Sequence, residues 1–139
     1  MSQTHSIRGR CLCGAVCIRA AAKHAHVEAC HCIMCRTWSG GPLLSVECGD
    51  SAVIDGEEHV TVYGSSDWAE RGFCSRCGTH LFYRLKRGGV FAVPVGLLEP
   101  GTPWEFTKQI FIDHRPAYYA FANATEQLTG EEVFAQHGA

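Results

Sequence analysis

Cys30-His31-Cys32-Ile33-Met34-Cys35-Arg36 is the stretch that decides the fold of this chain. It places three thiols within six residues, so near one another in sequence that they can meet at one point. Thiolate is a soft ligand that zinc prefers, so we expect these cysteines to hold a metal. Closed structural zinc sites use four ligands, whereas this stretch supplies three cysteines. The rest of the sequence must explain what fills the fourth position.

The composition is that of a globular protein without a strong charge. The chain has 139 residues and a net charge of −2, and 46% of its residues are hydrophobic. This length fits one domain, residues 1–139, with a core of its own. A nucleic-acid partner is not expected, because there is no excess of basic residues. No apolar run approaches the ~18 residues of a membrane span, and Met1 to Arg10 lacks the apolar core of a signal peptide, so we expect a cytoplasmic protein with no membrane partner.

The cysteine count favours metal binding over disulfides. Nine cysteines is an odd number, and a chain without an export signal rarely carries a full disulfide framework. Cys17 and Cys48 lie apart from the others and are assigned no chemistry. The remaining seven fall into three groups, which are Cys11-x-Cys13, Cys30-x-Cys32-x-x-Cys35 and Cys74-x-x-Cys77.

These groups can be combined in two ways. Either the two pairs close a four-thiolate site and the three central cysteines form a second, open site, or one pair joins part of the central group and leaves the other thiols loose. We prefer the first, because it uses every grouped cysteine. A four-cysteine zinc site is closed and structural, while a three-ligand site keeps a position for an exchangeable group.

An open three-cysteine site favours thiol chemistry. Three thiolates on one zinc leave a net charge of −1, which makes the ion a poor activator of water. An incoming thiol suits such a site better, because it can lose its proton on binding and stay nucleophilic. The alternative is a second structural zinc closed by a protein ligand, for which His31 is the obvious candidate. Since both sequence neighbours of His31 are expected ligands, strain disfavours that role, and the other chemical role for His31 is to carry a proton.

The remaining sequence predicts a mainly β chain. Fifteen glycines and five prolines separate short apolar runs, as in a fold of short strands. Ala117–Phe121 reads as a further strand, and Cys32–Trp38 as a short helical turn before Gly40. Thr129-Gly130-Glu131-Glu132 is a capping-box pattern that predicts a helix through Gln136. An antiparallel meander is expected from the strand-like runs Leu43–Glu47, Ala52–Ile54 and Val60–Tyr63.

Three stretches resemble the ordered motifs of the glutathione-dependent formaldehyde-activating enzyme family, also called the centromere-protein-V/GFA domain family. The resemblance extends over roughly residues 7–121 and leaves 122–139 as a C-terminal tail. Two later stretches are also similar to the family, Val93 to Leu98 and Ile110 to Pro116. The motifs that carry the likeness are Gly9-Arg10-Cys11-Leu12-Cys13-Gly14-Ala15-Val16, the stretch from Cys30 to Arg36, and Phe73-Cys74-Ser75-Arg76-Cys77-Gly78.

The resemblance implies a mainly β, Mss4-like single domain of short antiparallel strands with two zinc ions per chain. Cys11, Cys13, Cys74 and Cys77 would hold a structural zinc, and Cys30, Cys32 and Cys35 a second zinc near a glutathione site. The implied reaction is the condensation of formaldehyde with glutathione, as cosubstrate, to S-hydroxymethylglutathione. In formal terms this is carbon–sulfur lyase chemistry in reverse.

Two further readings complete the sequence-based expectations. A glutathione carboxylate can be bound by an arginine through a bidentate pair, and Arg36, next to Cys35, is the first candidate ahead of Arg71, Arg76 and Arg115. The alternative function is a non-catalytic, zinc-stabilised protein-binding module, since proteins of the wider Mss4-like group act on protein partners. In that case the second site would be closed, empty or purely structural.

Overall fold

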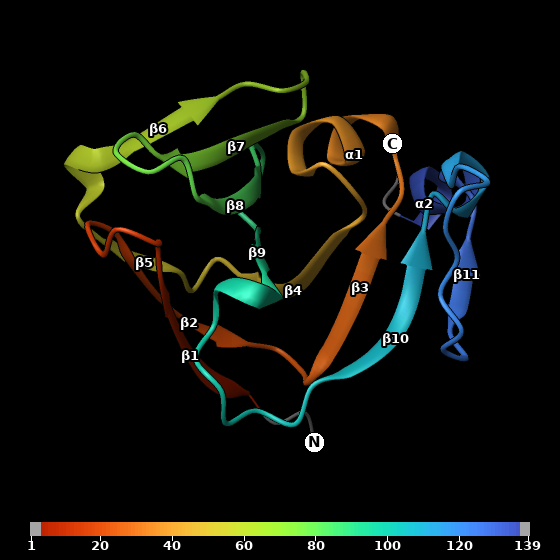
Figure 1. Cartoon of the computed structure of the whole chain (residues 1–139), viewed down its shortest axis with the longest axis horizontal. Coiled ribbons are helices and arrows are strands. Elements are labelled where there is room, and N and C mark those ends of the chain that lie inside the picture. Colours follow the sequence, from red (N-terminus) through yellow and green to blue (C-terminus); the bar gives the residue numbers. More distant parts are fainter. Residues whose placement is uncertain (1–3, 137–139) are drawn as a thin grey trace. The chain divides into compact units, whose positions relative to one another are not determined.

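The protein, described here by a computed structural model, is mainly β, as the sequence predicts (Figure 1). The structure describes residues 4–136. Its described residues fall into two compact units, residues 4–25 with 46–103 and residues 26–45 with 104–136. Within residues 4–136, no helix is long and apolar enough to cross a membrane. That residues 1–139 form one zinc-binding domain stays a prediction.

The first unit contains two antiparallel sheets. β1 (His5–Arg10), β2 (Cys17–Ala22) and β5 (Val53–Asp55) form one, in the order β1-β2-β5. The other follows the order β9-β8-β7-β6 and is formed by β6 (Val60–Tyr63), β7 (Ala69–Cys74), β8 (His80–Leu85) and β9 (Phe91–Pro94). Two short 3-10 helices, Glu57–His59 and Val95–Leu97, complete the unit.

β1 shows why its sequence forms a strand. Ile7 and Gly9 are buried, while the alternating Arg8 and Arg10 are exposed, which is the period-two pattern of a strand with one buried face. A Cβ at Gly9 would lie 2.5 Å from the backbone oxygen of Leu97, so only glycine fits this close approach. The hairpins β1-β2 and β7-β8 leave the loops 11–16 and 75–79, on which the first group of cysteines stands.

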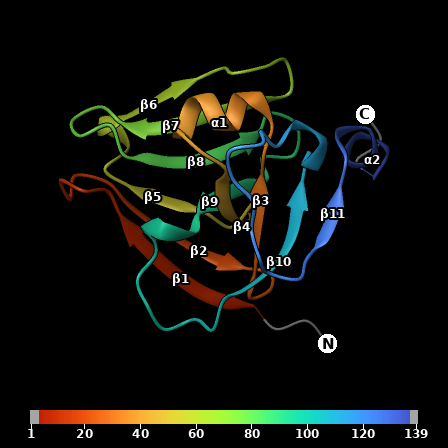
Figure 2. The same ribbon diagram turned by 45° about the vertical axis from the view of Figure 1, so that its right-hand side comes forward.

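The second unit is built on a sheet with parallel pairs. β3 (His26–Cys30) pairs in parallel with β10 (Glu105–Ile110), which pairs in parallel with β11 (Glu126–Leu128), so the three strands lie side by side (Figure 2). The first residues of β4 (Leu43–Gly49) pair with β3 in the antiparallel sense. Three helical segments complete the unit, α1 (Ile33–Ser39), a 3-10 helix at Ile112–His114, and α2 (Gly130–Gln136).

The expected helices are confirmed. α1 begins after Cys32 and ends at Gly40, which adopts a left-handed conformation (φ 81°) that favours glycine. α2 begins with the predicted capping box, in which the Thr129 hydroxyl accepts from the Glu132 backbone N–H and the Glu132 carboxylate accepts from the Thr129 backbone N–H.

Two strand predictions are wrong. The meander does not form, because β5 pairs with β2, β6 with β7 and β4 with β3, each with a partner other than its neighbour in that run. Ala117–Phe121 is a turn and extended chain without ladder pairing. Here the guanidinium of Arg115 donates to the backbone oxygens of Pro116 and Tyr119. In a strand, such oxygens would accept hydrogen bonds from the backbone of a neighbouring strand.

Candidate metal centres

The first group of cysteines comes from two hairpin loops of similar design. In the first loop, the N–H of Gly14 donates to the oxygen of Cys11 (3.0 Å), and in the second the N–H of Gly78 donates to the oxygen of Cys74 (2.7 Å). Both glycines have positive φ, 83° and 79°. The repeated turn aims two cysteines of each loop toward those of the other loop, which explains why glycine follows each cysteine pair.

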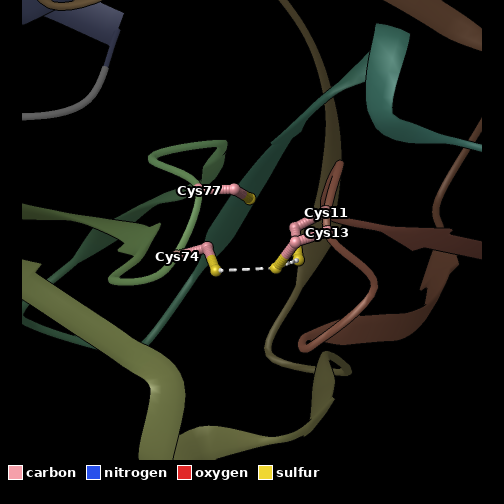
Figure 3. Close-up of side chains that lie close together, drawn as sticks. All are labelled: Cys11, Cys13, Cys74 and Cys77. Carbon is pink, nitrogen blue, oxygen red and sulfur yellow. Dashed lines mark hydrogen bonds between the residues drawn. The ribbon is translucent and has the colours of Figure 1, made fainter.

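The four sulfur atoms of this group face a common point (Figure 3). They lie within 4.8 Å of one another, and the distances from Cys13 are 3.6 Å to Cys11 and 3.7 Å to Cys74. A tetrahedral zinc with Zn–S bonds of about 2.3 Å places its sulfur atoms about 3.8 Å apart. The four cysteines therefore fit a zinc ion, and no disulfide joins them in this structure.

Thr79 ties the two loops together beside these sulfur atoms. Its hydroxyl oxygen accepts from the backbone N–H of Leu12 (3.1 Å) and lies 3.1 Å from the sulfur of Cys77. Hydrogen bonds from the side chain and then the backbone of Thr79 lower the pKa of Cys77 to about 5. These hydrogen bonds therefore favour the thiolate form of Cys77, which is the form that a metal requires.

The second group of cysteines surrounds the start of α1. Cys30 ends β3, Cys32 is the N-cap residue of α1, and Cys35 lies in its first turn. The sulfur of Cys32 accepts from the backbone N–H of Cys35 (3.3 Å), so the helix cap also orients the sulfur of Cys32. All three lie within 4.8 Å of one another.

These three thiols are buried, and that burial makes a cation necessary if they are to ionise. Cys30, Cys32 and Cys35 are 8%, 8% and 4% exposed. The neighbouring thiols Cys32 and Cys35, together with burial, raise the pKa of Cys30 far above its ordinary value. Three such groups can be thiolates together only if a positive ion compensates them, so their chemistry fits zinc. Met34, Leu43, Ile110 and Phe111 pack against the group and form its apolar surroundings.

His31 lies between two of these cysteines but engages both ring nitrogens elsewhere. Its ring is 0% exposed. Nε2 donates to the side-chain oxygen of Gln109 (2.8 Å), whose amide nitrogen donates to the Thr125 hydroxyl (2.8 Å). Nδ1 then accepts from the Tyr119 hydroxyl (2.6 Å). Burial lowers the pKa of His31, which keeps the ring neutral in this arrangement. The ring is not part of the cluster of sulfur ligands, and a proton-carrying role stays a prediction.

The four candidate arginines occupy different settings. Arg71 is 2% exposed and lies over the ring of Tyr83 at 5.1 Å, with its Nε donating to Ser65. Arg76 is exposed in the loop between Cys74 and Cys77. Arg36 and Arg115 both lie in the second unit, beside His31 and Tyr119.

The family model described as glutathione-dependent formaldehyde-activating enzyme matches residues 6–114 of this chain. That span contains all seven grouped cysteines. The chain belongs to this family. The resemblance read from the cysteine motifs is thereby confirmed.

Relatives of this member of the formaldehyde-activating enzyme family cover much of its length. An uncharacterized lyase from Schizosaccharomyces pombe is 34% identical over 126 residues, 90% of this chain and 92% of that protein. A protein from Halomonas elongata that carries the family's name is 34% identical over 85 residues, 55% of this chain and 54% of that protein. A crystal structure of a Rhodobacter sphaeroides protein matches with a TM-score of 0.60 and 25% identity, over 69% of this chain and 91% of that chain.

Sequence reasoning did not find the partners of His31. Gln109 and Tyr119 lie 78 and 88 residues along the chain from it. Neither stands in a pattern of ligand spacing, and only the parallel pairing of β3 with β10 places Gln109 beside the ring. In this protein, the polar groups that surround His31 are therefore not predicted by any local sequence motif.

Replacing Tyr119 by phenylalanine is expected to lower the free energy of unfolding by about 1–3 kcal/mol. The substitution leaves Nδ1 of the buried His31 without its donor, which is the cost of an unsatisfied polar group. Denaturant unfolding measures the change. Tyr118→Phe is the matched control, because Tyr118 is 76% exposed, and its effect should stay within about 0.5 kcal/mol. Equal losses in the two variants would contradict the bond to His31.

Proposed function

We propose that this member of the family is a zinc-dependent carbon–sulfur lyase acting on a glutathione adduct or a similar thiol adduct. In the direction of synthesis, the thiol sulfur bonds to the carbonyl carbon of formaldehyde. The π-electron pair of the carbonyl moves to oxygen, which takes the proton that the thiol gives up. With glutathione the product is S-hydroxymethylglutathione, and the lyase direction breaks the same carbon–sulfur bond. No electrons are gained or lost overall.

The difference between the two cysteine groups carries this proposal. The first group offers four sulfur ligands and is complete for zinc, whereas the second offers three. Among residues 4–136, no histidine, cysteine or carboxylate joins the three sulfur atoms of the second group as a fourth ligand. His31, the nearest candidate in sequence, uses both nitrogens in other hydrogen bonds. A position for a substrate sulfur is what this arrangement supports.

Each residue of the second group then has a separate task. Cys30, Cys32 and Cys35 would hold the metal, which supplies a place for the substrate sulfur and lowers the pKa of its thiol. Phe111 and Met34 pack against the three cysteines and help to exclude bulk water, which strengthens electrostatic interactions at the site. The hydrogen bonds of His31 fix the chain between Cys30 and Cys32, so that the two ligands keep their directions.

The purified protein is expected to contain about two zinc ions per chain. A mild chelator should remove one of them well before the other, because a three-ligand ion exchanges more readily than one that four thiolates enclose. Elemental analysis and a chromophoric zinc indicator measure the content and the two release phases. One tightly bound zinc, with no second, would contradict the open site.

Exchange NMR tests the reaction, because formaldehyde and glutathione also combine without an enzyme. The zinc-loaded protein should raise the exchange rate between hydrated formaldehyde and S-hydroxymethylglutathione above the rate in buffer. The control is the same protein with its zinc removed by chelator. An unchanged rate would overturn the lyase proposal and favour the non-catalytic protein-binding module. A cytoplasmic location stays a prediction.

A further inference from the structure

Two arginines of the second unit bond to residues of one small cluster next to the second cysteine group. Nε of Arg36, on α1, donates to the backbone oxygen of His31 (2.9 Å). Nη1 of Arg115 donates to the backbone oxygens of Pro116 (3.1 Å) and Tyr119. Because the His31 ring and the Tyr119 hydroxyl are themselves joined by a hydrogen bond, the two guanidinium groups bond to the same small polar cluster.

In the part of the chain that the structure describes, neither arginine forms an ion pair. Within residues 4–136, no carboxylate lies within ion-pair distance of Arg36 or Arg115. Three arginines of the first unit contrast with them, since each has a carboxylate partner, which are the pairs Arg8 with Glu99, Arg19 with Asp55 and Arg84 with Glu70.

The two charges also act on one group, Tyr119. Burial raises the pKa of Tyr119, and both arginines oppose that rise. Two cations that act on one residue favour the binding of an anion near it.

The free ends of the arginines match a carboxylate. A guanidinium carries five N–H donors in a planar fork, and Arg36 donates to the protein through its Nε. Among the described residues, its two Nη atoms make no hydrogen bond, and the side chain is half-buried, so the fork is both oriented and accessible. Two parallel bonds from such a fork are the usual geometry for binding a carboxylate.

We propose that Arg36 and Arg115 form a carboxylate-binding subsite beside Cys30, Cys32 and Cys35, and that the thiol substrate therefore carries a carboxylate. This inference rests on the proposed function, in which the thiol is a substrate. Arg36 is adjacent in sequence to the ligand Cys35, so sulfur and carboxylate of one small molecule can be held at the two places. A simple alkyl thiol would occupy only the position for the sulfur.

The first experiment measures binding without using the thiol. S-methylglutathione keeps both carboxylates of glutathione, but its sulfur has no thiol proton to lose. Calorimetric titration into the zinc-loaded protein should show binding. Arg36→Gln and Arg115→Gln should each weaken this binding about tenfold or more, because each variant loses hydrogen bonds between charged groups. Arg87→Gln removes the same charge at an exposed turn of the first unit and should leave binding within twofold. Absent binding, or equal binding in all variants, would overturn the subsite.

The second experiment tests whether Arg36 recognises the carboxylate of the thiol or only maintains the structure of the site. Exchange with formaldehyde is measured for 3-mercaptopropionate and for 2-mercaptoethanol, which differ in the carboxylate. The unaltered protein should have the lower KM for 3-mercaptopropionate, and Arg36→Gln should bring the two KM values together. Arg36→Lys, which keeps the charge but lacks the fork, should restore part of the difference. A variant that raises both KM values equally would contradict carboxylate recognition.

These outcomes also separate the subsite from the proposed reaction. If no thiol exchanges faster than in buffer, while S-methylglutathione binds and loses affinity in both arginine variants, the reaction fails and the subsite stands. If thiols exchange with no preference for a carboxylate, the reaction stands and the subsite fails.

Discussion

Cys74→Ser is expected to cost about 4 kcal/mol or more of the free energy of unfolding and to lower the thermal midpoint by more than about 10 °C. Cys74 is fully buried, and its sulfur lies 3.7 Å from that of Cys13, on a loop 61 residues away. The serine hydroxyl is a poor zinc ligand, so the metal of the first group should be lost. With it goes the link between the two hairpin loops, because metal binding at a structural site is itself folding free energy.

Cys48→Ser is the matched control for this prediction. Cys48 is also in the first unit and is 1% exposed, but its thiol donates to the backbone oxygen of Val46 (3.8 Å) and belongs to neither cysteine group. Serine there should cost about 1 kcal/mol. Zinc content and thermal unfolding are measured for both variants, with about one zinc lost only in Cys74→Ser. If both variants lose the same stability and keep their zinc, the first group is not a structural metal site.

Cys32→Ser is expected to leave the fold intact and to remove the proposed activity, by about 100-fold or more. The expected loss exceeds the 10–100-fold that changes to the residues around metal ligands usually cause, because a ligand itself is removed. The fold is spared for a local reason. Cys32 is the N-cap of α1, and serine is a preferred N-cap residue whose hydroxyl can accept the Cys35 backbone N–H in place of the sulfur.

Exchange NMR, zinc analysis and thermal unfolding check this second prediction together. About one zinc per chain should remain, held by the four-cysteine group, and the thermal midpoint should fall by only a few degrees. Cys17→Ser, outside both groups, should keep both zinc ions and the full exchange rate. A loss of stability as large as in Cys74→Ser would mean that the two sites are not divided into structural and chemical roles.

The cysteine groups could be predicted because ligand spacing is a local property. Cys30, Cys32 and Cys35 lie on a strand end, a helix cap and a first helical turn, and each is placed by residues next to it in sequence. The polar groups around them could not be predicted in this way. The contact of His31 with Tyr119 depends on how Arg115 holds the chain from Pro116 to Tyr119, and no period or spacing in the sequence encodes that.

The errors in the fold have a related cause. The sequence indicates where apolar runs lie, but partners in a sheet are chosen by the whole chain, so β5 joins β2 instead of its neighbours. β1 is not among the predicted strands for a different reason, since Ile7 is its one large apolar side chain and the other buried position is Gly9. The alternation was present in the sequence and would have indicated a strand.

The two cysteine groups differ in how far apart their members lie along the chain, and this affects the response of the protein to free zinc. Cys30, Cys32 and Cys35 stay close even when the chain is denatured, so the unfolded form can chelate zinc there. Zinc that binds both forms stabilises the folded one less. The four-cysteine group spans a separation of 61 residues between Cys13 and Cys74, which an unfolded chain brings together only at an entropic cost. Added zinc should therefore protect the fold mainly through that group.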